Sequence, residues 1–117
     1  MLIAEDGEDT RESLTQYFKT IYDVVSVPDG LQAINCVSES RFDVVITDVR
    51  MPHKTGIDLL IRIKKGKKEK IPPKVIVLTG LLDSGADYLK SLGADAVLEK
   101  PLSLVALAEV VRKVLGT

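Results

Sequence analysis

Four apolar runs in this 117-residue chain each end at a polar residue that can take part in chemistry. The runs, each with the residues that end it, are Leu2-Ile3-Ala4 before Glu5-Asp6, Val44-Val45-Ile46-Thr47 before Asp48, Val75-Ile76-Val77-Leu78 before Thr79, and Ala96-Val97-Leu98-Glu99 before Lys100. If the runs are parallel strands, these polar groups gather at one edge of the sheet, where ligands bind in open α/β folds.

Strand-like and helix-like segments alternate five times along the chain. Short β-branched runs are typical of strands buried on both faces, and the stretches between them carry apolar residues at helical spacing. The predicted helices cover residues 8–19, a segment around 33–37, a segment from 55 to 63, residues 84–92 and residues 103–115. Ser103 is predicted to cap the last helix, and Gly93 to end the one before it.

This alternation predicts an α/β fold built on a doubly wound, five-stranded parallel sheet, because parallel strands need right-handed crossovers. Five strands favour the order 2-1-3-4-5, which places the ends of the first and third strands side by side at the switch point. Glu5, Asp6 and Asp48 are then expected to meet there, with Thr79 and Lys100 beside them. No internal repeat or second domain is visible, so residues 1–117 are predicted to form a single domain.

Composition restricts the classes of function that the chain can serve. The net charge of -1 argues against direct nucleic-acid binding or a membrane-surface role, since both normally need an excess of basic residues. No apolar run approaches the length of a membrane span and no signal-peptide pattern opens the chain, so we expect a cytoplasmic protein. Cys36 is the only cysteine, and a buried structural thiol is favoured over a reactive one. The lysine-rich stretch from Lys64 to Lys70 is predicted to be a solvated loop.

The acidic edge suits a metal-assisted reaction on a phosphate. Clustered carboxylates repel one another, and a hard divalent cation such as Mg²⁺ (or Mn²⁺ in its place) is their natural neutraliser. Asp48 can act as a nucleophile and form an acyl phosphate. The Thr79 hydroxyl and the Lys100 ammonium can hold phosphoryl oxygens.

Each of these residues also has an ordinary structural interpretation. Asp48 alone could cap a helix, Thr79 alone could be a turn residue, and Lys100 alone could be a surface charge. The functional interpretation is favoured because four separate strand ends carry groups whose chemistry is complementary.

The motifs together resemble the receiver domain of bacterial response regulators over essentially the whole chain. They are Glu5-Asp6, Asp48, Met51-Pro52 with Gly56, Thr79, Gly93-Ala94 and Lys100-Pro101. The resemblance implies a flavodoxin-like (βα)5 fold and a two-component signalling switch rather than an enzyme, apart from self-catalysed gain and loss of its own phosphoryl group. It also implies a cis Lys100–Pro101 peptide bond.

The same resemblance implies a role for each matching residue. Asp48 would accept a phosphoryl group from the phosphohistidine of a sensor histidine kinase or a phosphotransfer domain, and Thr79 and Lys100 would hold the phosphoryl oxygens. The implied Mg²⁺ ligands are Asp6 and Asp48 directly, Glu5 through water, and the backbone carbonyl of Arg50. The output partner or domain would be controlled through the fourth helix, fifth strand and fifth helix, and homodimerisation on phosphorylation is a further implied mode.

Three departures from the family pattern concern signalling rather than phosphorylation. Val97 stands where many receivers carry a Tyr or Phe whose rotamer reports phosphorylation. Arg50 and Leu81 occupy the two variable positions that flank the phosphorylation site, which predicts slow loss of the phosphoryl group. The stretch between Thr79 and Gly93 is about one residue shorter than usual.

Because Val97 has no ring to swing, we expect readout through the loop of residues 79–82 and the fourth helix. Val105, Val110 and Val114 add apolar surface to the fifth helix, beyond its core-facing stripe. The alternative is that these three valines only broaden a buried face.

Two other classes of function compete with the switch. A phosphatase with an Asp nucleophile would need an acid or base two residues after Asp48, but that position is Arg50. A pseudo-receiver that only docks partners would be expected to lack Asp48, Thr79 or Lys100, and all three are present.

Overall fold

The computed structural model of the chain describes residues 1–51, 55–65, 71–80, 85–100 and 103–116. Strands and helices alternate along these residues, as the sequence predicted. In chain order they are β1 (Leu2–Ala4), α1 (Glu8–Phe18), β2 (Val25–Val27), α2 (Gly30–Glu39), β3 (Val44–Asp48), α3 (Gly56–Lys65), β4 (Lys74–Thr79), α4 (Ala86–Ser91), β5 (Ala96–Glu99) and α5 (Leu104–Leu115).

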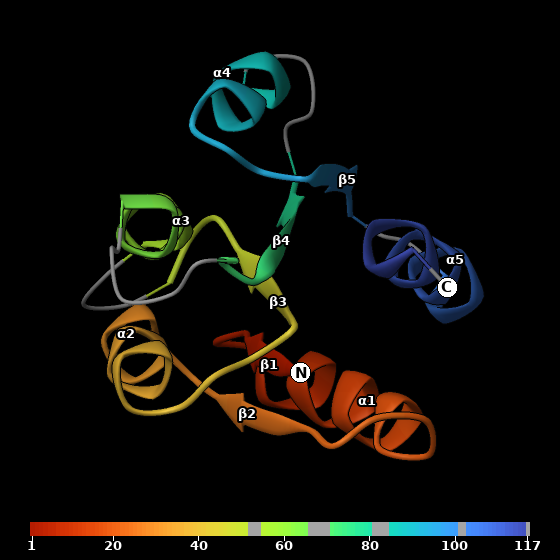
Figure 1. Cartoon of the computed structure of the whole chain (residues 1–117). Helices are drawn as coiled ribbons and strands as arrows, with labels where there is room; N and C mark the ends of the chain where they lie inside the picture. The colour runs from red at the N-terminus through yellow and green to blue at the C-terminus, as the bar shows by residue number, and fades with distance from the viewer. Residues whose placement is uncertain (52–54, 66–70, 81–84, 101–102, 117) are drawn as a thin grey trace.

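The strands form one parallel sheet in the order β2-β1-β3-β4-β5, which confirms the predicted flavodoxin-like topology. Figure 1 shows α1 and α5 on one face of the sheet and α2, α3 and α4 on the other. The register pairs Ala4 with Thr47, and Asp48 with Leu78. The last residues of β1, β3 and β4 therefore lie at the same edge of the sheet.

Side chains alternate between the two faces along each strand, so a continuous apolar run serves two cores. On β4, Val75 and Val77 face α2, α3 and α4, whereas Ile76 and Leu78 face α1 and α5. The helices complete the first cluster with the buried side chains of Ala33, Leu59, Leu60, Ile63 and Leu89. They complete the second with those of Leu14, Phe18, Leu107 and Val111.

Helix ends follow local chemistry in three places. The Asp29 side chain caps α2 by accepting from the Gln32 N–H (2.8 Å), and Ser103 caps α5 by accepting from the Ala106 N–H (2.9 Å). Gly93, just beyond α4, has φ of 111°, a left-handed conformation that glycine adopts without a steric penalty. The predicted roles of Ser103 and Gly93 are thus confirmed.

Some sequence predictions need correction. The helical spacing predicted that Ile21 shares one face of the first helix with Leu14 and Phe18, but Ile21 lies beyond the end of α1 and is exposed. Lys64 belongs to α3 and is half-buried, so the predicted solvated loop does not begin there. On α5, Val110 and Val114 are half-buried against the core and Val105 is largely exposed, so two of the three valines broaden the buried face.

Several predictions lie outside the described residues. These are the conformation of residues 66–70, the contribution of Leu81 to the flanking pair, the start of the fourth helix at residue 84, and the Lys100–Pro101 bond. Cys36 is half-buried against the core, and burial raises the pKa of its thiol, which fits the structural interpretation. Among the helices described, none combines the length and apolar character needed to cross a bilayer.

Candidate functional site

The three predicted acids come together at the carboxyl edge of the sheet. Glu5 and Asp6 directly follow β1, and Asp48 is the last residue of the neighbouring strand β3. One carboxylate oxygen from each of the three residues lies within 4.8 Å of the others. Glu5 is buried, Asp48 is half-buried and Asp6 is exposed, so the cluster is open to solvent on one side.

Lys100 bridges two of these acids. Its ammonium donates to Asp48 Oδ2 at 2.7 Å and to Glu5 Oε1 at 3.1 Å. The Lys100 backbone N–H donates to the Thr79 carbonyl oxygen at 2.8 Å, which holds the residue just past β5 beside the end of β4. The Lys100 side chain keeps 31% of its surface exposed, compared with 12% for Asp48 and 4% for Glu5. The Lys100 ammonium, which is more exposed than either acid, therefore pairs with one buried and one half-buried carboxylate.

Burial and crowding change the acidity of this group. Burial of Glu5, followed by its hydrogen bond to and repulsion from Asp48, raises the pKa of Glu5 to about 7. Lys100 partly offsets this shift by favouring the charged carboxylate. Burial alone would lower the pKa of Lys100, but its hydrogen bonds to Asp48 and Glu5 outweigh burial and raise it. The ammonium thus stays charged, and the carboxylates of Glu5 and Asp48 repel each other when both are ionised.

The backbone of Asp48 is held by two contacts that sequence reasoning did not assign. The buried Thr47 hydroxyl donates to the Asp48 carbonyl oxygen at 2.9 Å. Gly56, at the start of α3, lies so close that a Cβ placed on it would be 2.1 Å from the same oxygen. The Gly56 N–H also donates to the Val49 carbonyl at 2.8 Å. The motif match pointed to Gly56, but no pattern in the sequence pointed to Thr47.

Thr79, Arg50 and Arg11 complete the surroundings of the acids. Thr79 is a buried residue at the end of β4, directly beyond the Leu78 that pairs with Asp48. Arg50 is exposed, two residues after the end of β3. The Arg11 guanidinium donates to the Glu5 backbone carbonyl at 3.0 Å, a contact that depends on how α1 leaves the sheet and that residue spacing alone could not predict.

The acids fit a hexacoordinate divalent cation. Mg²⁺ binds oxygen at about 2.0–2.1 Å, so two of its ligands lie at most about 4.2 Å apart. Oxygens within 4.8 Å of one another therefore suit a cation that binds two carboxylates directly and the third through water or after a small side-chain movement. The open side leaves room for the waters and phosphate oxygens that Mg²⁺ usually keeps.

A doubly wound sheet with lysine-bridged acids at its carboxyl edge defines a class of α/β domains suited to phosphate chemistry. Residues 1–112 match the response regulator receiver domain family, and the chain belongs to that family. Receiver domains act in two-component signalling, in which a histidine kinase phosphorylates a receiver aspartate, and they are signalling domains rather than enzymes.

Relatives and solved structures agree with this assignment. The aerobic respiration control sensor protein ArcB of Escherichia coli is 33% identical over 72% of this chain, and ethylene receptor 2 of Oryza sativa is 30% identical over 97% of it. The chain spans only 11% and 16% of the length of these two proteins.

Among solved structures, the Francisella response regulator 1452 receiver domain is 29% identical with a TM-score of 0.83. The alignment covers 97% of this chain and 93% of the Francisella chain. CheY4 of Vibrio cholerae is 26% identical with a TM-score of 0.87, and the alignment covers 97% of this chain and 95% of the CheY4 chain.

Proposed function

We propose that this chain is a phosphorylation switch whose acceptor is Asp48, with a histidine kinase or a phosphotransfer domain as donor. The observation that carries the proposal is the contact of the Lys100 ammonium with Asp48 at 2.7 Å, inside a cluster of three acids. A carboxylate beside a fixed cation and a metal-binding group of acids has what phosphoryl transfer mainly needs, which is positioning and charge neutralisation.

The transfer step can be written on the residues of this chain. A carboxylate oxygen of Asp48 attacks the phosphorus of the phosphohistidine, an O–P bond forms, and the P–N bond breaks with its electron pair left on the imidazole nitrogen. Lys100, already bound to Asp48 Oδ2, is placed to hold a phosphoryl oxygen, and Thr79 is assigned a second one.

The proposed metal ligands are Asp6, Asp48, the Arg50 backbone carbonyl and, through water, Glu5. Mg²⁺, when bound there, neutralises negative charge on the carboxylates and on the transferring phosphoryl group. Asp6→Asn tests this set: it removes a charged ligand without touching the acceptor and should weaken Mg²⁺ binding in calorimetry.

We infer that the phosphodonor approaches from the side of α1 and α5. A pocket lined by residues of both helices, among them Thr10 and Leu104, also includes Lys100. A phosphodonor in this pocket would meet the Lys100 ammonium, which lies 2.7 Å from Asp48 Oδ2.

Intact mass after incubation with acetyl phosphate and Mg²⁺ tests the proposal directly. We expect a gain of about 80 Da, the mass of one phosphoryl group. Asp48→Asn should abolish the gain and leave the fold intact, because the amide removes the nucleophile but keeps the shape. Asp43→Asn, the same change at the opposite end of β3, serves as the matched control and should phosphorylate normally.

Each other outcome has a defined meaning. Borohydride trapping that labels Asp58 or Asp83 instead of Asp48 would place the acceptor elsewhere. Rapid turnover of acetyl phosphate without accumulation of the phosphorylated form would favour a phosphatase. No reaction with a well-folded protein would favour a docking module.

The proposed output face consists of the loop after β4 together with α4, β5 and α5. Leu89 is the buried residue of α4, and Tyr88 beside it is 56% exposed. Val105 on α5 is 66% exposed and adds an apolar side chain that the core does not use. Because α4 is joined to the core by the one buried side chain of Leu89, this helix can shift at low cost. The exposed side chains of Tyr88 and Val105 offer contacts to an output domain, a partner protein or a second copy of the chain.

A further inference from the structure

Helix α3 touches the proposed acceptor at one end. Its first residue, Gly56, has no room for a Cβ against the Asp48 carbonyl oxygen, and its N–H is bonded to Val49. A movement of the Asp48 backbone is therefore passed to the start of α3, since two groups in van der Waals contact cannot approach further. The buried side chains of Leu59 and Ile63 fix the helix on the core, so it responds as a unit.

The other end of α3 is tied to the connection between α4 and β5. The Lys64 ammonium donates to Asp95 Oδ2 at 3.0 Å and to the Pro73 carbonyl oxygen at 3.3 Å. The Lys64 carbon chain lies over Gly93, where a Cβ would be 2.7 Å from Lys64 Cγ. The Lys64 side chain thus packs on Gly93, just beyond α4, and also pairs with the carboxylate of Asp95, just before β5.

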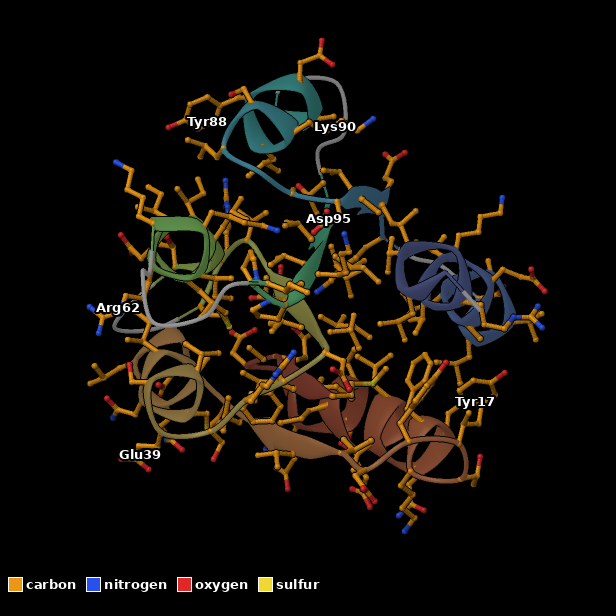
Figure 2. All side chains as sticks on the ribbon, viewed as in Figure 1. Tyr17, Glu39, Arg62, Tyr88, Lys90 and Asp95 are labelled. Carbon is orange, nitrogen blue, oxygen red and sulfur yellow. The ribbon has the colours of Figure 1, made fainter. Side chains whose placement is uncertain are left out.

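Asp95 makes this connection part of the sheet. Its Oδ2 also accepts from the Val75 N–H at 2.8 Å, and its own N–H donates to the Val75 carbonyl at 2.8 Å. Figure 2 shows Asp95 below α4, where the α4–β5 connection reaches the sheet. The Lys64 ammonium and the backbone N–H of Val75 in β4 therefore share one carboxylate oxygen, and a displacement of Lys64 changes how β5 is held.

We propose that α3 is a mechanical link from the phosphoacceptor to the output face, with Gly56 as its contact at Asp48 and Lys64 as its contact at Gly93 and Asp95. The inference rests on the proposed function, because it takes Asp48 as the residue that is phosphorylated. The ten residues of α3 span about 15 Å, enough to join these two places by one rigid element.

This link would act beside the route through Thr79 and the loop after β4. Val97 carries no aromatic ring that could report phosphorylation, so a second mechanical path has more to contribute here. An ordinary ion pair between partly exposed groups would be worth little. The Lys64 contact differs from such a pair because it combines packing over a glycine at φ 111° with two acceptors on different segments.

The test compares amide chemical shifts with and without beryllofluoride and Mg²⁺, a stable mimic of the phosphoryl group, in wild type and in Lys64→Met. Methionine keeps the length and apolar character of the side chain but removes its charge and both hydrogen bonds. Lys65→Met, the exposed neighbour on the same helix, is the matched control. Asp95→Asn is a second variant, since its amide oxygen still accepts from the Val75 N–H but has no charge for Lys64.

In wild type and in Lys65→Met we expect the mimic to shift the amides of Gly80 and of Gly93 to Val97. In Lys64→Met and in Asp95→Asn the shifts at Gly93 to Asp95 should be largely lost, while the shift at Gly80 remains. Full shifts at Gly93 to Asp95 in both variants would overturn the link and leave the phosphorylation switch untouched. No acetyl phosphate mass gain and no shift at Gly80 in wild type would instead show that the proposed function is wrong.

Discussion

At the scale of single residues, Glu5 carries an electrostatic conflict that the bound cation would relieve. Its side chain is 4% exposed and shares a hydrogen bond with Asp48, so its pKa is about 7 rather than the ordinary 4.5. A carboxyl group with a raised pKa favours folding while it is protonated. Its contribution is fully present below pH 4.5 and is lost as the pH rises through about 7.

We therefore predict that the metal-free protein loses stability between pH 5 and pH 8, and that Glu5→Gln removes much of this loss. The shift corresponds to an upper limit of about 3 kcal/mol in the free energy of unfolding. Urea unfolding in the presence of a chelator at both pH values measures it. Glu8→Gln, an exposed position at the start of α1, should follow wild type. Equal pH dependence in wild type and Glu5→Gln would contradict the assignment.

Arg50 is the residue expected to control how long the phosphoryl group persists. It is exposed beside the end of β3, and neither Arg50 nor Leu81 offers a carboxylate or amide that could orient an attacking water. We predict that Arg50→Asn and Leu81→Glu each accelerate dephosphorylation by roughly tenfold, which corresponds to about 1.4 kcal/mol in the barrier.

Intact mass measures the rates: the fraction of protein that still carries the phosphoryl group, about 80 Da, is followed from time zero. Arg41→Asn removes an exposed arginine from the other end of β3 and should leave the rate unchanged. If neither Arg50→Asn nor Leu81→Glu speeds the reaction, access of water is not what limits the lifetime.

At the scale of the elements, the start of α3 is fitted to the end of β3. The Asp48 carbonyl is held by the Thr47 hydroxyl on one side and approached by Gly56 on the other. The α3 helix could not begin at this place with any larger residue unless the backbone of the acceptor moved. The site is thus positioned by a helix that contributes no side chain to it.

Gly56→Ala should consequently destabilise the fold by about 1–3 kcal/mol, the usual cost of overpacking, and slow phosphorylation by acetyl phosphate. The reason is that the new Cβ would lie 2.1 Å from the Asp48 carbonyl oxygen. Urea unfolding and the rate of mass gain measure the two effects. Gly85→Ala, where a Cβ meets nothing within 4 Å, is the control. Wild-type values for Gly56→Ala in both assays would show that the start of α3 can yield.

At the scale of the whole molecule, the sheet has a core on each face, and each core includes a helix of the proposed output face. On the face with α1 and α5, a pocket lined by residues of both helices includes Lys100. The face with α2, α3 and α4 holds Leu89 and the contacts of Lys64. A change at the carboxyl edge can reach α4 and α5 through the strands that both faces share.

We predict that a phosphoryl mimic shifts backbone amides on the far side of the molecule as well as at the site. A phosphoryl group adds roughly -1.5 to -2 charge beside Thr79 and Lys100, enough to bias a loop with two arrangements. Shifts are expected at Gly80, Leu89 and Val105, and Asp48→Asn with the same additions should show none. Changes confined to the acidic loops, with α4 and α5 silent, would rule out this output face.

The pattern of residues was enough to predict the alternation of elements, the strand order and the acids that meet at the sheet edge. It could do so because strand burial, helical spacing and crossover handedness are local or nearly local properties. The places of Glu5, Asp48 and Lys100 follow from the ends of their strands, and the structure agrees.

Contacts between residues far apart in the chain depend on how the elements pack, which the residue pattern does not specify. Three features depend on distances between packed segments. They are the raised pKa of Glu5, the close contacts of Thr47 and Gly56 with the Asp48 carbonyl, and the contact of Lys64 with Asp95. Lys64 looked like the start of a solvated lysine run because its partner lies 31 residues away. Packing of α3 on the sheet brings the two together, and no periodicity in the sequence encodes that distance.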